Sequence, residues 1–468
     1  MKSKITLLII FSIWITSIGY TQTPKSAVGG GEFVFNPNKT PCLTSEQRIS
    51  FKRDVKSNIK TLAIQNKLLF SKSNMDSHPL FIWPIKKANH VNYNDVWSVS
   101  GYVDHNVSFP NQLTDYNCGT RTYDTDNGYN HQGVDIYLWP FQWKLMDESS
   151  VEIIAAAPGQ IISKSEGNFD QSCDFNTTTP WNAIFVQHSD GSVAIYGHMK
   201  NGTVTSKNVG DMVETGEYLG VVGSSGVSTG PHLHFEVYTN DSFTTLVDPF
   251  SGTCNNMNTE SWWANQKPYH DSNINALMTH SAAPDVFPSC PTIETTYESN
   301  DFDIAEDIYL SVFLRDQIAN TSLNLKVIRP DGSYLYNWAI NVGTTASSWY
   351  YYWFFPVDTV GEWTWEATYE GHTESHKFNV TSALSVTNSQ LKNTSIYPNP
   401  ANGLVHINSV KKIVKVEILD VTGKTIIYIQ QTTQGIENIN TSSLSNGLYF
   451  LRLEGDYNER KTIKFIKA

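Results

Sequence analysis

Near the middle of the chain lies the sequence Gly230-Pro231-His232-Leu233-His234-Phe235-Glu236-Val237. Apolar and polar residues alternate along it, which is typical of a β-strand with one face in the core. Residues two apart on a strand point to the same side, so His232 and His234 are expected to project together, away from the apolar residues. Two such imidazoles can bind one metal ion, or one can bind while the other transfers protons. A hydrogen-bonded pair of structural histidines is the alternative that this stretch alone leaves open.

Two further motifs carry histidines. The sequence His131-Gln132-Gly133-Val134-Asp135 precedes an expected strand and supplies an imidazole and a carboxylate, both good zinc ligands. The sequence Tyr196-Gly197-His198-Met199 ends a predicted hairpin whose turn is Asp190-Gly191. His188, on the opposite strand of that hairpin, is assigned a structural role. Because the chain has 13 histidines, none of these motifs is specific when taken alone.

Together the motifs resemble the lysostaphin/LytM family of zinc metallopeptidases. The resemblance extends over residues 79–252 and includes the order of the smaller motifs, namely Phe81-Ile82-Trp83-Pro84, Ala156–Gly159, Val209-Gly210-Asp211 and Val247-Asp248-Pro249. It implies a single zinc ion as cofactor, held by His131, Asp135 and His234. It also implies that His198 and His232 are the catalytic histidines. Three protein ligands leave the fourth tetrahedral position to water, as a hydrolytic zinc site requires.

The function implied is that of a secreted zinc metalloendopeptidase. Its substrate would be the cross-links or stem peptides of peptidoglycan, and its nucleophile a zinc-activated water assisted by the two catalytic histidines. The chain lacks the sequence His-Glu-x-x-His, which separates it from the metalloproteases that use a glutamate base. Two alternatives stay open: a protease of the same chemistry acting on Gly-rich extracellular proteins, and a non-catalytic module that binds the cell wall.

Charge and hydropathy indicate an exported protein with no nucleic-acid partner. Lys and Arg number 33 against 45 Asp and Glu, and no long basic run occurs. Lys2 and Lys4 precede the apolar run Ile5–Ile18, and small residues follow it, so residues 1–19 are predicted to be a signal peptide. No later segment has 18 consecutive apolar residues, so no stable membrane span is expected.

The chain is predicted to be mainly β, with three folded parts. The expected order is an antiparallel β catalytic domain of the LytM type at residues 79–252, an immunoglobulin/fibronectin-like β-sandwich at 291–382 and a small β domain at 395–468. Residues 20–78 are expected to be a pro-segment or N-terminal arm, 253–290 a connector and 383–394 a linker. Within the arm, Thr44 and Gln47 form a predicted capping box before a helix whose apolar face includes Val55, Ile59 and Leu62.

The last part resembles the C-terminal sorting domain of type IX secretion substrates. The motifs that carry the resemblance are Tyr397-Pro398-Asn399-Pro400 at its start and Asn446-Gly447-Leu448-Tyr449 near its end. The resemblance implies outer-membrane type IX machinery as a partner. It also implies a secreted protein, extracellular or at the cell surface, from which this domain is removed. A third small β domain with a binding role is the alternative.

The five cysteines fit two disulfides and one remaining thiol in an oxidising compartment. Five cysteines allow 5 × 3 = 15 such pairings, and the sequence alone does not choose among them. The preferred pairs are Cys254 with Cys290 and Cys118 with Cys173, because each pair brackets one irregular segment.

Overall fold

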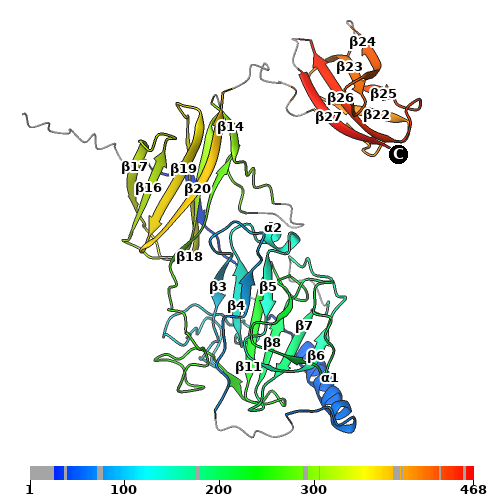
Figure 1. Ribbon diagram of the computed structural model, residues 1–468. Helices are drawn as coiled ribbons and strands as arrows, with labels where there is room; N and C mark the ends of the chain where they lie inside the picture. The colour runs from blue at the N-terminus through cyan, green and yellow to red at the C-terminus, as the bar shows by residue number, and fades with distance from the viewer. Residues whose placement is uncertain are drawn as a thin grey trace, which may run out of the picture. The chain divides into compact units, whose positions relative to one another are not determined.

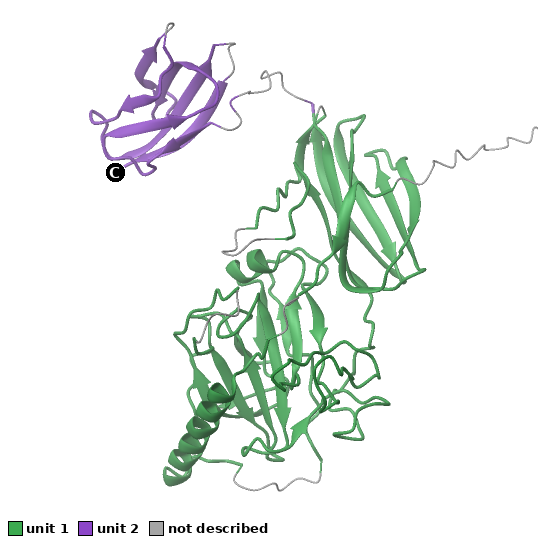
Figure 2. Ribbon diagram, turned by 180° about the vertical axis from the view of Figure 1, so that it is seen from behind, with its two compact units in different colours: residues 1–381 green, residues 382–468 purple. Residues whose placement is uncertain are grey.

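The computed structural model describes residues 26–35, 40–70, 77–173, 179–287, 294–304, 306–382, 391, 394–431, 434–456 and 460–468. The predicted signal peptide therefore lies outside the described residues. The chain divides into two compact units, residues 1–381 and 382–468 (Figure 2). Both consist mainly of β-strands, which confirms the predicted fold class. Within the described ranges, no helix combines the length and apolar character needed to cross a membrane.

The largest sheet of the first unit carries the three histidine motifs (Figure 1). Its strands follow the order β3-β4-β11-β8-β7-β6-β9, and β12 pairs with β11. Their bounds are β3 (Trp97–Gly101), β4 (Val134–Leu138), β6 (Gly159–Ser165), β7 (Ala183–Gln187), β8 (Val193–Gly197), β9 (Met212–Val213), β11 (His232–Tyr238) and β12 (Leu246–Val247). A three-stranded sheet joins β10 (Tyr218–Val221), β5 (Val151–Ile154) and β2 (Ile85–Lys87).

The register of β11 brings the motifs together. His234 lies opposite Asp135 on β4 and opposite Gly197 on β8, directly before His198. Leu233 and Phe235 point the other way and are fully buried in the main core, as the alternation predicts. Strand β11 therefore places the site histidines on one face of the sheet and the apolar residues Leu233 and Phe235 on the other.

Helix α1 (Ser45–Ile64) has the predicted capping box. The Gln47 amide donates to Thr44 Oγ1 over 3.2 Å, and the Thr44 amide donates to Gln47 Oε1 over 2.8 Å. The helix lies beside β6 (Figure 1) and buries Phe51, Val55 and Leu62. The Phe51 ring meets the edges of Phe185 and Phe243 at centroid distances of 5.1 and 5.2 Å. A second, short helix is α2 (Gln142–Asp147).

The β-sandwich recruits strands from outside residues 291–382. One sheet has the order β1-β18-β15-β13 and the other β14-β20-β19-β16-β17. The bounds are β1 (Gly29–Glu32), β13 (Asn273–His280), β14 (Asp301–Asp303), β15 (Ile308–Gln317), β16 (Ser322–Ile328), β17 (Tyr334–Asn341), β18 (Ala346–Phe355), β19 (Gly361–Tyr369) and β20 (His372–Thr381). Strand β1 comes from the N-terminal arm and β13 from the segment expected to be a connector. Both cover edges of the β15–β18 pair that would otherwise expose unpaired backbone groups.

The sandwich also packs directly on the catalytic sheet. Trp139 Nε1 donates to the Leu314 carbonyl over 3.1 Å. Arg315 on β15 is almost fully buried, lies 2.6 Å from Asp95 Oδ2 and stacks over the Trp97 ring. A buried guanidinium paired in this way ties the two parts into one unit.

The second unit has its own core and two small sheets. The sheets are β21-β22-β25 and β24-β23-β26-β27. Their bounds are β21 (Ser395–Tyr397), β22 (Leu404–Asn408), β23 (Ile413–Leu419), β24 (Thr425–Gln430), β25 (Asn438–Asn440), β26 (Gly447–Gly455) and β27 (Arg460–Lys467). The alternating residues Val405 and Ile407 on β22, and Val416 and Ile418 on β23, supply part of this core.

Both predicted disulfide pairs are wrong, because Cys118 is bonded to Cys254. The chain folds back so that the Cys254 amide donates to the Tyr116 carbonyl over 2.9 Å, which places the two cysteines side by side. Cys173 is also in a disulfide, Cys42 is a free, buried thiol, and Cys290 lies outside the described residues.

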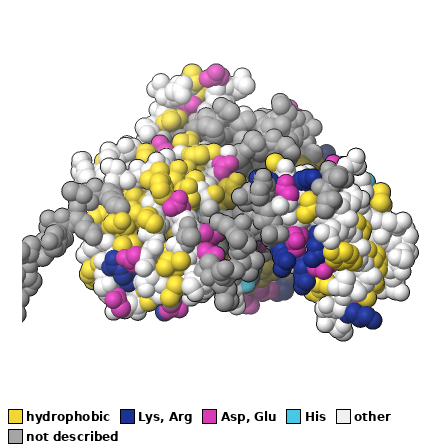
Figure 3. All heavy atoms as spheres, turned by 90° about the horizontal axis from the view of Figure 1, so that it is seen from above, with side chains coloured by type: hydrophobic (Ala, Val, Ile, Leu, Met, Phe, Trp, Pro, Cys, Tyr) yellow, Lys and Arg dark blue, Asp and Glu magenta, His cyan; other side chains and the backbone are white. Residues whose placement is uncertain are grey.

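Charges of both signs are mixed on the surface. On the face drawn in Figure 3, the Lys and Arg side chains lie next to Asp and Glu side chains. Among the described residues visible there, no broad basic patch forms, in keeping with the net charge of −12.

Candidate metal centre

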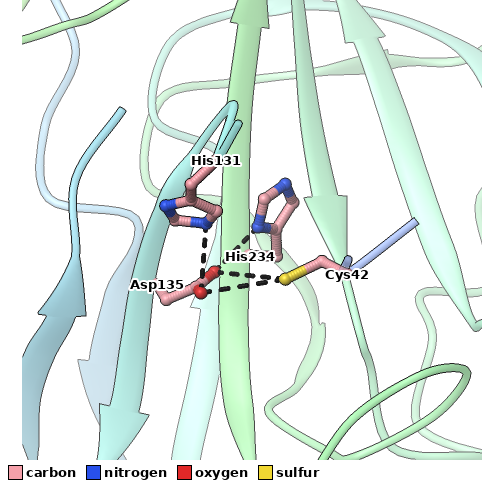
Figure 4. A group of neighbouring side chains, drawn as sticks. All are labelled: Cys42, His131, Asp135 and His234. Atoms are coloured by element: carbon pink, nitrogen blue, oxygen red, sulfur yellow. Dashed lines mark hydrogen bonds and ion pairs between the residues drawn. The ribbon is translucent and has the colours of Figure 1, made fainter. Parts of the chain in front are cut away.

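The three residues predicted to bind zinc meet at one point in the fold. His131 precedes β4, Asp135 lies on β4 and His234 lies on the adjacent β11 (Figure 4). His131 Nε2 is 3.1 Å from Asp135 Oδ2, and His234 Nδ1 is 2.7 Å from Asp135 Oδ1. One ligand atom from each of the three, together with the sulfur of Cys42, lies within 4.8 Å of all the others. Two imidazoles and a carboxylate in this arrangement are a donor set that suits zinc.

The two predicted catalytic histidines lie beside this cluster. The His198 and His232 rings are 4.3 Å apart between centroids, and His232 Nε2 is 3.8 Å from Asp135 Oδ1. All five predicted site residues are at most 2% exposed. The structure thus brings together every residue that the sequence singled out for the site.

Backbone carbonyls set the orientation of three of the rings. His131 Nδ1 donates to Tyr102 O over 2.8 Å, His198 Nδ1 to Ser225 O over 2.6 Å and His232 Nδ1 to Gly230 O over 2.9 Å. A carbonyl oxygen only accepts, so each Nδ1 holds a proton and each Nε2 is the ring nitrogen left for another partner. Within the described part of the chain, these three buried Nε2 atoms have no hydrogen-bond partner. Unpaired buried acceptors are costly, and a metal ion or a reacting water accounts for them.

His234 is oriented by a carboxylate instead. Its Nε2 donates to Glu236 Oε2 over 2.9 Å, which leaves Nδ1 to face Asp135. Glu236 in turn pairs with Arg48 of α1 over 2.7 Å and accepts from the Tyr238 hydroxyl. A carboxylate behind a ligating imidazole fixes its tautomer and raises its basicity. The sequence carried a signal for this role, because Glu236 stands two residues after His234 on the same strand face.

Burial and neighbouring charge shift the protonation of the cluster. Burial alone would raise the pKa of the Asp135 carboxyl, but His131 and His234 hold it well below its usual range. Burial alone would lower the pKa of His131, but the Asp135 carboxylate raises it to about 9. The pKa of His198 is lowered by burial and by the adjacent His232. The first two shifts share one cause, the attraction between the Asp135 carboxylate and the imidazoles, which favours positive charge beside an ionised carboxylate.

Cys42 is the member of the cluster that the sequence analysis missed. Its sulfur lies 3.8 Å from Asp135 Oδ2 and 2.8 Å from the Tyr123 hydroxyl. With His198 and His232 it forms a second group of possible metal ligands. No motif surrounds Cys42 in the sequence. The one hint is that Cys42 is the cysteine left over once the two expected disulfides are formed.

Two stretches of the chain match the models of known families. Residues 129–249 match the model of Peptidase family M23, and residues 395–468 match the Secretion system C-terminal sorting domain. The chain therefore contains an M23 peptidase domain and a C-terminal sorting domain, which confirms both resemblances seen in the sequence.

Individual relatives match over short stretches. The DD-carboxypeptidase/endopeptidase Mpg of Neisseria meningitidis serogroup B is 41% identical over 59 residues, which is 13% of this chain and 13% of that protein. The glycyl-glycine endopeptidase ALE-1 of Staphylococcus capitis is 32% identical over 125 residues, or 26% of this chain and 29% of the relative. The catalytic domain of lysostaphin from Staphylococcus simulans is 27% identical, with 27% of this chain and 83% of that chain covered and a TM-score of 0.20. The chain thus spans well under half the length of the curated relatives it matches.

Proposed function

We propose that the protein is a secreted zinc metalloendopeptidase that hydrolyses peptide bonds in the cross-links or stem peptides of peptidoglycan. The observation that carries the proposal is the convergence of His131, Asp135 and His234 beside two histidines whose buried Nε2 atoms have no partner among the described residues. The M23 domain supports the reaction class. The printed activities of the two curated relatives, a glycyl-glycine endopeptidase and a DD-carboxypeptidase/endopeptidase, support the substrate.

Zinc would be held by His131 Nε2, an Asp135 oxygen and His234 Nδ1. A zinc ion so bound supplies Lewis-acid activation of a water molecule. Glu236 binds Nε2 of His234 and so leaves Nδ1 of that ring to face the metal position. The Tyr102 carbonyl binds Nδ1 of His131 and so leaves Nε2 of that ring to face it. The protein's part is thus to hold two ring nitrogens and one carboxylate with their lone pairs facing one point.

His198 and His232 would handle protons. Each ring has its Nδ1 fixed to a carbonyl and its Nε2 without a partner among the described residues, so one can accept the proton of the attacking water. The other can stabilise the developing oxyanion once protonated, and either can return a proton to the leaving amine. General acid–base assistance of this kind contributes roughly 10²–10⁴ in rate.

The sorting domain suggests the route and the destination. We infer passage through outer-membrane type IX machinery and release to the extracellular space or the cell surface. Residues 20–78 are then a pro-segment or arm and 383–394 the linker to the domain that is removed.

The proposal is tested with purified sacculi. Protein from which the N-terminal segment has been cleaved should release peptides with new amino termini, and a chelator should abolish the release. Elastin-like protein serves as the competing substrate. Cleavage of elastin-like protein but not of sacculi would assign the chemistry to Gly-rich proteins instead.

The division of roles is tested by zinc content. In protein from which the N-terminal segment has been cleaved, His131→Ala, Asp135→Ala and His234→Ala should each lose zinc, because two remaining ligands hold the ion poorly. His198→Ala and His232→Ala should keep one equivalent of zinc and lose roughly 10²–10⁴ in turnover. Elemental analysis decides: zinc retained in His234→Ala but lost in His232→Ala would exchange these two roles.

A further inference from the structure

The N-terminal arm lies across the candidate metal centre. Before Cys42, strand β1 pairs with β18 and the Phe35 ring lies 5.0 Å from the His232 ring. After Cys42, Leu43 and α1 pack on the catalytic sheet in a cluster with Ile195 and Tyr238, on the same face as His234. Cys42 itself is 5% exposed, and no catalytic histidine is more than 2% exposed. A peptide substrate therefore has no access to the site while the arm is in place.

The position of the Cys42 sulfur fits a zinc ligand. In a tetrahedral site with a zinc–sulfur bond of about 2.3 Å and a zinc–oxygen bond of about 2.1 Å, sulfur and oxygen lie about 3.6 Å apart. The sulfur is 3.8 Å from Asp135 Oδ2. It also belongs to the group formed with His198 and His232, the side on which the reacting water would sit.

The surroundings of Cys42 argue against simple packing. A buried free cysteine usually acts as a small apolar residue among apolar neighbours. Cys42 instead contacts the Asp135 carboxylate and the Tyr123 hydroxyl, and it shares its space with imidazoles that have unpaired Nε2 atoms among the described residues. Such polar surroundings are typical of a sulfur atom that binds a metal ion.

The arm is anchored on both sides of this cysteine. Arg48 forms an ion pair with Glu236 whose side chains are 13% and 0% exposed, and Glu236 is the carboxylate that orients His234. Phe51 adds an apolar contact with Phe185 and Phe243. On the opposite side, β1 is hydrogen-bonded to β18 from Gly29 to Glu32. The position of the Cys42 sulfur thus depends on contacts of the arm with distant parts of the chain, and not on the residues next to Cys42 in the sequence.

We propose that the Cys42 thiolate is a fourth protein ligand of the zinc and that the described parts of the arm, residues 26–35 and 40–64, keep the peptidase latent. The inference rests on the proposed function. A hydrolytic zinc site keeps one position open for water, and a fourth protein ligand closes it. The thiol gives up its proton to solvent when it binds the metal. Removal of the arm takes away the sulfur, opens the position and uncovers the buried histidines in one step.

Cobalt in place of zinc reports the ligand directly, without activity. The full chain loaded with one equivalent of Co²⁺ should show a sulfur-to-cobalt charge-transfer band in the near ultraviolet. The band should vanish in Cys42→Ala and persist in Leu43→Ala, the matched control, which removes a buried side chain of the same segment. A cobalt-loaded wild-type protein without the band, or a band that survives in Cys42→Ala, overturns the assignment.

Latency is tested on a short soluble peptide taken from peptidoglycan. A protease recognition sequence is inserted after Ile64, the exposed last residue of α1, and digestion continues until mass spectrometry finds no residues 26–64. Hydrolysis should rise at least about tenfold as the water position opens. An equal rate before and after removal overturns the latency. Zinc-loaded protein that is inactive after removal but shows the cobalt band before it would contradict the proposed function and leave the Cys42 ligand in place.

Discussion

At the scale of single residues, His234 is held between two carboxylates, one on each ring nitrogen. Asp135 faces Nδ1 at 2.7 Å and Glu236 accepts from Nε2 at 2.9 Å. Burial alone would raise the pKa of the Glu236 carboxyl, but Arg48 and His234 hold it well below its usual range. The group therefore stays an anion at neutral pH and keeps the ring in one tautomer.

Glu236→Gln should weaken zinc binding without removing a ligand. The substitution keeps the shape of the side chain but loses the charge that raises the basicity of His234, and such changes cost roughly 10–100-fold in metal affinity. Competition with a chromophoric chelator measures the effect. Tyr238→Phe is the control, because it removes a neighbour of Glu236 and leaves the bond to His234 intact. Equal losses in the two variants would mean that the network is structural only.

At the scale of elements, β13 links the catalytic sheet to the sandwich. The strand pairs with β15 from Asn273 to His280, and seven of its eight residues are buried. Asn275 on the same strand donates to the carbonyls of Trp97 and Trp139 in the catalytic part. The family resemblance in the sequence ends near Pro249. In the structure, β13 extends the catalytic part beyond that point through contacts that the family motifs do not include.

A chain that ends after Cys290 should be less stable and less soluble than one that ends after Thr381. The shorter chain leaves β13 with an unpaired edge and leaves Trp139 Nε1 and the acceptors of Arg315 without partners. The shorter chain also exposes Trp139 and Phe141, which pack on Phe313, and exposing such a side chain costs about 1.5–3 kcal/mol. Thermal unfolding and soluble yield compare the two chains. Identical melting temperatures and zinc contents would show that the catalytic domain is complete without the sandwich, as the sequence pattern alone suggested.

At the scale of the whole molecule, the two compact units have separate cores, and the second coincides with the matched sorting domain at 395–468. A unit that makes its own core can be removed without exposing the core of the other. We expect mass spectrometry of the mature extracellular protein to find a start at or after Tyr20 and an end before Ser395. Peptides from Ile463–Lys467 in that form would contradict removal of the domain.

Local patterns in the sequence were enough for the elements that carry the site. The alternation around His232 and His234, the spacing from His131 to Asp135, and the pair Thr44 and Gln47 are each read within a few residues, because a strand or a helix end is specified by its own side chains. Which residues meet at the candidate metal centre was predicted by the resemblance of these motifs, taken together, to the lysostaphin/LytM family.

Only the tertiary structure decided how distant segments meet. Cys118 bonds Cys254 because the chain folds back near Tyr116, and no spacing rule between cysteines contains that contact. Cys42 reaches the metal centre because packing of α1 and pairing of β1 carry it there. Glu236 contacts His234 because the two residues lie two positions apart on one strand. The ion pair of Glu236 with Arg48, in contrast, depends on the packing of α1 against the sheet. Such contacts depend on burial and loop closure across the whole fold, which local periodicity does not encode.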